Sequence, residues 1–153
     1  MKDIRDIRDT IKLIETLSEL SEIEYEEDAL LDVFDSDTII RYSAGLCHVL
    51  AFALQDCIPE KTDIVVIYDF DLNIESEVIT HVVVKYKDYF IDISNITTSI
   101  EYIASQYEDW GEQAIVVNND RESICKLAGK FSSQEYNDAK NVANKICDIL
   151  FAE

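Results

Sequence analysis

One segment, GLCHVLAFALQDC at residues 45–57, constrains the fold more than any other. Its apolar side chains occupy nearly the whole circumference of the helix that they predict. Ser43 and Gly45 can cap the beginning of this helix, and Pro59 prevents its continuation. The apolar positions are Leu46, Val49, Leu50, Ala53, Leu54 and Cys57. A helix without a polar face must be covered by other elements, so the segment predicts a central, mostly buried helix.

Three segments rich in β-branched and aromatic residues follow this helix, at residues 63–70, 78–86 and 89–94. Only Lys87 and Asp88 separate the second segment from the third. Such a short connection can join only antiparallel strands, so we expect a hairpin there.

The flanking sequence predicts helices at both termini. They are expected at about residues 3–20, 26–34, 98–107, 121–129 and 133–150, with a turn at 35–37 and a further strand at 114–118. Helices followed by neighbouring strands and then by mixed elements indicate an α+β fold with a small, mostly antiparallel sheet. The length of 153 residues fits a single domain over residues 1–153.

The composition excludes several classes of protein. An apolar content of 48% with three glycines and one proline argues against disorder. The formal charge of −19 repels phosphates and anionic lipid surfaces, so we expect neither direct nucleic-acid binding nor membrane binding. The N-terminus has no apolar signal region, and no segment approaches the roughly 18 apolar residues of a membrane span. We expect a cytoplasmic protein.

The four cysteines are Cys47, Cys57, Cys125 and Cys147, and they include no Cys-x-x-Cys pair. Neither a disulfide framework nor a zinc knuckle is therefore predicted, and reduced thiols are expected. The last three lie on apolar helical faces and are interpreted as packing residues. No cofactor-binding motif is present, and we expect no cofactor.

Cys47 differs because it opens the buried helix, where the N-terminal dipole favours a thiolate. Adjacent residues on a helix point about 100° apart, so we expect that His48 does not reach the thiol beside it. His81, at the beginning of the second β segment, is the better candidate for a base.

The predicted hairpin places an acid near His81. Counting outward from the two-residue turn pairs Val83 with Asp92, and His81 with Ser94. Opposed residues share a face and every second residue returns to it, so His81 and Asp92 become diagonal neighbours at roughly 7 to 8 Å. A three-residue turn would place them on opposite faces.

These residue types suit nucleophilic catalysis. A thiol becomes nucleophilic beside a base and a helix N-terminus, and Asp92 would orient the imidazole of His81. Two other interpretations stay open. Cys47 can be a packing residue, and the set Cys47, His48, His81 and Asp92 can be a zinc site, although it lacks the usual ligand spacing.

The segments GLCHVLAFAL and THVVVKYKDYFIDI resemble the Cys-His-Asp core of papain-like fold hydrolases, in particular transglutaminase-like proteins and related bacterial thiol amidases. The resemblance covers residues 43–94. It implies a nucleophile, Cys47, at the start of a helix packed on an antiparallel sheet, with His81 as base and Asp92 as orienting acid. A papain-type protease carries a glutamine before the cysteine, and residues 39–46 contain none. Tyr42 or Ser43 could assist the Cys47 backbone N–H in binding an oxyanion.

Two classes of function follow. The first is a cysteine-dependent hydrolase or acyl transferase, such as a peptidase, amidase, deamidase or transglutaminase-like enzyme, that acts on a protein, peptide or amide substrate. The alternative is an acidic binding or inhibitor protein of the anti-restriction, immunity or nucleic-acid-mimic type with a basic protein partner. The observation that supports this alternative is the charge of −19.

Overall fold

The computed structural model describes residues 33–71, 76–107 and 113–151. The helix expected at 3–20 lies outside these residues, as does the one expected at 26–34 except for its last two positions. Within the described residues, no helix is both long enough and apolar enough to cross a membrane.

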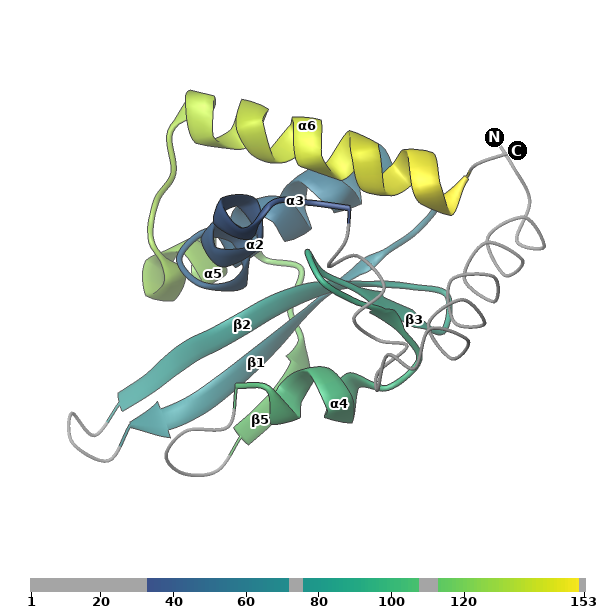
Figure 1. The fold of residues 1–153 in the computed structure, drawn as a ribbon. Coiled ribbons are helices and arrows are strands. Elements are labelled where there is room, and N and C mark those ends of the chain that lie inside the picture. Colours follow the sequence, from purple (N-terminus) through teal and green to yellow (C-terminus); the bar gives the residue numbers. More distant parts are fainter. Residues whose placement is uncertain (1–32, 72–75, 108–112, 152–153) are drawn as a thin grey trace.

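An antiparallel sheet forms the centre of the described structure (Figure 1). Its strands are β1 (Asp63–Asp71), β2 (Ser76–Tyr86), β3 (Tyr89–Ile91), β4 (Ile96–Thr97) and β5 (Gln113–Val117). They lie in the order β4-β3-β2-β1-β5, and every neighbouring pair is antiparallel. The prediction of an α+β fold with a mostly antiparallel sheet is confirmed.

The helices lie on both faces of this sheet. They are α2 (Ser36–Ser43), α3 (Cys47–Cys57), α4 (Ile100–Ser105), α5 (Arg121–Ala128) and α6 (Ser133–Leu150). Figure 1 shows α2, α3, α5 and α6 on one side of the sheet and α4 on the other. The expected helices at 98–107, 121–129 and 133–150 are confirmed, with shorter bounds for the first.

Two hydrophobic clusters fill the space between these layers because side chains alternate along β1 and β2. On one face Val66 and Val82 pack with α3 and α6 in the larger cluster. On the other face Val65 and Val83 pack with Ile103 of α4 in the smaller cluster. Helix α3 is buried along nearly its whole length, as its apolar circumference predicts.

Two details at the beginning of the described chain differ from prediction. The turn expected at 35–37 is the start of α2, because the Asp35 side chain caps the helix by accepting a hydrogen bond from the Thr38 N–H at 2.8 Å. Helix α3 starts at Cys47, and its N-cap residue Leu46 makes no side-chain cap. The expected capping by Ser43 or Gly45 is therefore wrong.

The hairpin register is confirmed, because Tyr86 pairs with Tyr89 across the two-residue turn. A two-residue turn of this kind requires a positive φ, which a glycine usually supplies. Here Lys87 adopts it, with a φ of 56°. The third strand is shorter than expected, since pairing ends at Ile91 rather than continuing to Ser94. The chain leaves β2 at this point, and its departure creates the candidate site.

Candidate active site

Cys47 is the first residue of α3 and is 6% exposed. Within the described part of the chain, its backbone N–H makes only a long contact of 3.4 Å with the Ala44 carbonyl. Helix N-termini carry a partial positive charge from their unpaired N–H groups. Because no side-chain oxygen caps α3, this field is available to a thiolate at Cys47.

The uncovered edge of β2 supplies another donor to the same sulfur. β3 pairs with β2 only at Val84, Lys85 and Tyr86, so β3 does not cover the preceding residues of β2. The Val82 backbone N–H interacts with Cys47 from this edge and favours the thiolate. The early end of β3 therefore permits the N-terminus of α3 to approach β2.

His81 and Asp92 are brought together as the hairpin geometry predicts. The His81 Nε2–H donates a hydrogen bond of 2.8 Å to Asp92 Oδ2, and the two side chains are 0% and 3% exposed. A β-bulge lies next to His81, because Ile67 pairs with His81 whereas Tyr68 pairs with Ile79. Bulges beside functional sites alter the direction of a side chain, and this one is centred on the residue before His81.

A turn after β3, rather than the strand itself, holds Asp92. The Oδ1 atom accepts hydrogen bonds from the backbone N–H groups of Ser94 at 2.8 Å and Asn95 at 2.7 Å. The Asn95 side-chain amide donates to both carboxylate oxygens, at 2.9 and 3.0 Å. This local capture by an aspartate explains why the strand ends early. Asn95 was not predicted, although an amide three residues after Asp92 is the signal that could have identified it.

The two charged forms stabilise each other. Burial would raise the pKa of Asp92, but the hydrogen bond and charge of His81, with the donors of Ser94 and Asn95, lower it below its ordinary value. Burial would lower the pKa of His81, but its bonds to Asp92 and Cys47 raise it to about 9. At neutral pH the pair is therefore a carboxylate and an imidazolium.

The same surroundings activate Cys47. Burial alone would raise the pKa of its thiol. The hydrogen bonds of His48 and His81, the charge of His81 and the backbone N–H of Val82 oppose burial and lower the pKa to about 6. The Nδ1 atom of His81 makes no hydrogen bond of standard geometry within the described residues, and the partner that it does meet is this sulfur, a weak hydrogen-bonding atom.

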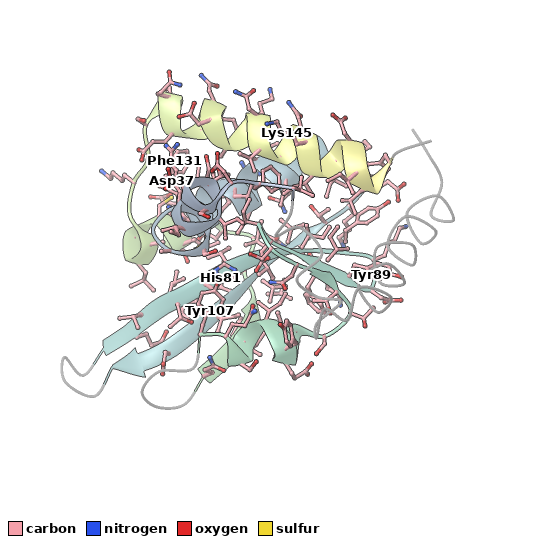
Figure 2. The ribbon with its side chains drawn as sticks, viewed as in Figure 1. Asp37, His81, Tyr89, Tyr107, Phe131 and Lys145 are labelled. Atoms are coloured by element: carbon pink, nitrogen blue, oxygen red, sulfur yellow. The ribbon has the colours of Figure 1, made fainter. Side chains whose placement is uncertain are left out.

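Tyr107, which sequence reasoning missed, covers the imidazole of His81. The two rings stack with centroids 4.1 Å apart and planes 13° apart, and Figure 2 shows them side by side. Burial raises the pKa of Tyr107, the charges of Asp92 and Cys47 raise it further, and a hydrogen bond with Ser43 opposes them. Tyr107 therefore stays a neutral phenol at neutral pH. It follows a short helix without any distinctive motif, so no sequence signal pointed to it.

The prediction that His48 does not reach Cys47 is wrong. Contact with His48 is the largest of the interactions that lower the thiol pKa. The ring is 1% exposed, and its Nε2–H donates a 2.8 Å hydrogen bond to the Gly129 carbonyl. Cys47 and His48 are the first two residues of α3, and the angle of about 100° between adjacent helical side chains does not prevent this contact.

The two predicted helpers of the oxyanion site lie in different places. Tyr42 is buried, and the charges that act on it come from Arg41 and from Asp138 and Glu135, beyond α2. It borders a cavity of about 220 Å³ between α2 and α6, which does not include Cys47. Ser43 forms a hydrogen bond with Tyr107, and the charge of Cys47 raises the pKa of this tyrosine.

Among residues 33–71, 76–107 and 113–151, no three His, Cys, Asp or Glu side chains form a group that could hold a metal ion. The alternative of a zinc site at Cys47, His48, His81 and Asp92 therefore has no support in this part of the chain. Comparison of the chain with family models, with curated proteins and with solved structures finds no match. The interpretation of the site depends on its own geometry.

Proposed function

We propose that the protein is a cysteine-dependent hydrolase or acyl transferase in which Cys47 is the nucleophile, His81 the acid–base residue and Asp92 the orienting acid. The observation that carries the proposal is the buried hydrogen bond from His81 to Asp92, formed beside a helix-terminal thiol whose pKa is about 6. A structural ion pair needs no activated thiol next to it, whereas nucleophilic catalysis does. We also propose that α3 and the β1–β3 sheet form a papain-like core.

The chemistry would proceed in two steps. The Cys47 thiolate attacks the carbonyl carbon of an amide, ester or thioester, and the tetrahedral intermediate expels the leaving group, which takes a proton from the His81 imidazolium. His81 is then neutral and can remove a proton from the water or amine that attacks the acyl-enzyme. Asp92 and the stacked ring of Tyr107 keep the imidazole in one orientation throughout.

Backbone and side-chain donors near the sulfur suit an oxyanion. The Cys47 N–H makes only the 3.4 Å contact with Ala44, so little is lost when it turns to a substrate oxygen. The neutral phenol of Tyr107 lies within electrostatic range of Cys47. These donors replace the glutamine that a papain-type protease would carry.

An activated ester tests the proposal without knowledge of the natural substrate. The protein is incubated with p-nitrophenyl acetate, and the expected result is a burst of p-nitrophenolate with one acetyl group on Cys47, located by peptide mass spectrometry. Cys47→Ser and His81→Ala should lose the burst, while Cys57→Ser should keep it. Acetylation spread evenly over the four cysteines, or unchanged in His81→Ala, would contradict the proposal.

The alternative of an acidic binding protein stays a prediction that no specific observation favours. The described residues account for less than half of the charge of −19. Several of their carboxylates are paired, namely Asp56 with Arg121, Asp138 with Arg41 and Glu60 with Lys87.

A further inference from the structure

The two edges of the central sheet are built differently. β4 at one edge has only two residues, Ile96 and Thr97, and both are buried. β5 at the other edge has five residues and lies beside β1 (Figure 1). Within the described residues, β5 pairs with no strand except β1. One edge of the sheet is therefore short and buried, and the other is open.

The backbone of β5 directs hydrogen-bonding groups outward along this open edge. The Asn118 N–H donates to the Ile64 carbonyl next to β5, at 2.8 Å. In an antiparallel ladder the N–H and C=O groups of successive residues point to opposite sides. The groups of Val116 therefore face β1, as those of Asn118 do, and the groups of Ile115 and Val117 face away from it. Such a row of outward groups is a template for another strand.

β5 also exposes apolar side chains on both faces of the sheet. Ile115, Val116 and Val117 are 42%, 45% and 56% exposed. Paired residues share a face, so Ile115 and Val117 lie on the face of the smaller hydrophobic cluster and Val116 on that of the larger one. Natural edge strands are usually protected by charged residues, proline or a bulge. Residues 113–119 include no charged residue and no proline, and the pairing of β5 with β1 has no shift in register.

The end of β5 is held in place by side chains of its own chain. Asn119 accepts a hydrogen bond from the Ile64 N–H at 2.8 Å and donates one to Asp63 at 3.0 Å. The Asn118 amide donates to the Tyr68 hydroxyl at 3.1 Å. A strand fixed in this way loses little conformational entropy when it binds a partner.

The pattern of exposed residues on β5 is self-complementary. A twofold axis through Val116 would place two copies of β5 antiparallel, with Val116 opposite Val116 of the second copy and Ile115 opposite its Val117. Each exposed apolar side chain then meets another apolar side chain. The backbone suits the same register, because Ile115 and Val117, whose groups point outward, form the hydrogen-bonded pairs.

Charge also favours a second copy as the occupant of this edge. Two chains with a formal charge of −19 repel each other, and the repulsion is weakest where uncharged surfaces meet. Residues 113–119 supply such a surface. Asp120, which follows them, caps α5 by accepting a hydrogen bond from the Ser123 N–H at 3.3 Å. A basic partner, in contrast, would find no carboxylate on β5.

We propose that the outer edge of β5 is a dimerisation surface, on which a second copy of this chain pairs its own β5 antiparallel about a twofold axis at Val116. The two sheets then form one continuous sheet. A single strand from each copy buries a small area, and interfaces below about 1,200 Å² are typical of weak, transient complexes. The dimer is therefore reversible and depends on protein concentration. It is independent of the proposed function, because β1 separates β5 from the strand that carries His81.

Sedimentation velocity of the native protein from about 10 µM to about 1 mM tests the proposal in a range suited to a weak dimer. The sedimentation coefficient should rise with concentration towards that of a dimer. Val116→Lys places like charges directly opposite each other and should weaken dimerisation at least about tenfold. Ile40→Lys, at a 65% exposed position of α2, changes the net charge equally and should dimerise like the native protein.

A cysteine variant tests the position of the twofold axis. Residues of a non-hydrogen-bonded pair have Cα atoms about 4.5 Å apart, which is within reach of a disulfide. Val116→Cys should therefore form a disulfide-linked dimer rapidly when oxidised by air with copper phenanthroline, as measured by non-reducing gel electrophoresis. Ile40→Cys is the control for random collision and for the native thiols. If Val116→Lys does not fold, as judged by circular dichroism, this crosslink decides the question.

Three outcomes would overturn the proposal. The first is a native protein that stays monomeric at about 1 mM; if this monomer binds a fluorescent peptide with the sequence of residues 113–119, the edge accepts a peptide strand instead of a second copy. The second is a dimer that survives Val116→Lys. The third is crosslinking of Val116→Cys no faster than that of Ile40→Cys. Alkylation of Cys47 should be the same in Val116→Lys and the native protein, so failure of the dimer leaves the proposed function intact.

Discussion

The two ends of α3 carry the same residue in opposite environments. Cys47 opens the helix and Cys57 closes it, about 15 Å away along the axis. The thiol pKa is lowered to about 6 at the first end and raised at the second. Both thiols lose solvent contact, so burial alone cannot explain the difference.

What differs is the charge that each sulfur meets. Cys47 meets two imidazoles and the backbone N–H of Val82. At Cys57 burial dominates, the carboxylate of Asp56 raises the pKa further, and the ammonium of Lys140 only partly offsets them. The thiol of Cys57 donates to Asn144 Oδ1 at 3.1 Å, a contact that favours the protonated form. The helix dipole adds to this difference in thiol pKa, because it favours an anion at the N-terminus and disfavours one at the C-terminus.

The largest expected effect is on reactivity. At pH 6 we expect iodoacetamide to modify Cys47 about 100-fold faster than Cys57, and Cys147, whose pKa is raised to about 12, slowest of all. Peptide mass spectrometry after short exposure measures each rate. Equal rates at Cys47 and Cys57 would remove the contrast between the two ends.

The second largest effect is expected on stability, when the Asp92 carboxylate near the N-terminus of α3 is removed. Asp92→Ala leaves the His81 imidazolium buried without its partner and frees the donors of Ser94 and Asn95. We expect a loss of about 3 to 5 kcal/mol in the free energy of unfolding, measured by urea denaturation. Asp92→Asn, which keeps an acceptor for these donors, is the matched control and should lose less. Equal losses in the two variants would show that the retained acceptor contributes nothing, and an Asp92→Asn variant as stable as the native protein would show that the charge of Asp92 has no role.

The pH dependence of stability should reveal the thiolate–imidazolium pair. His81 has a raised pKa of about 9, so its contribution is complete below about 6.5 and is lost as the pH rises towards 9. Cys47 has a lowered pKa, so its contribution is complete above about 9 and is lost as the pH falls through 6. Between these limits the two slopes oppose each other, and the native protein should show nearly constant stability.

Cys47→Ala should uncover the slope of His81. Its free energy of unfolding is expected to fall as the pH rises above about 6.5, by at most about 1.4 kcal/mol per pH unit. Urea denaturation at several pH values measures it, and Cys57→Ala is the control that should stay flat. A flat profile in Cys47→Ala as well would mean that His81 is not held as an imidazolium.

The smallest effect is expected at the C-terminal end, where charges also meet. Arg121 contacts Asp56 at 2.6 and 3.1 Å, and the Tyr136 hydroxyl donates to the same carboxylate. The two charged side chains are 38% and 41% exposed, so solvent weakens the pair. Arg121→Gln should cost about 1 kcal/mol or less, with less effect in high salt, as measured by thermal denaturation. A loss as large as that of Asp92→Ala would contradict the distinction between a buried and an exposed pair.

The predictions that the structure confirms came from local sequence patterns. The apolar circumference of residues 46–57 predicted a buried helix, and the two-residue turn at Lys87 and Asp88 predicted the register that brings His81 towards Asp92. Two predictions failed because a side chain competed with the backbone. Asp35 capped a helix in place of forming a turn, and Asp92 ended a strand that was expected to continue.

The catalytic roles of Cys47, His81 and Asp92 stay predictions. The positions of these residues depend partly on the local sequence and partly on the tertiary structure. The sequence by itself determined the secondary structure around them and the His81–Asp92 pairing, because these depend on residues close in the chain and on the period of a strand. Only the tertiary structure decided that Gly129 holds His48 across 81 positions of the chain, that Tyr107 stacks on His81, and that the uncovered edge of β2 meets the start of α3. Those contacts depend on how separate elements pack in three dimensions. The spacing of residues along the chain does not show which distant residues meet.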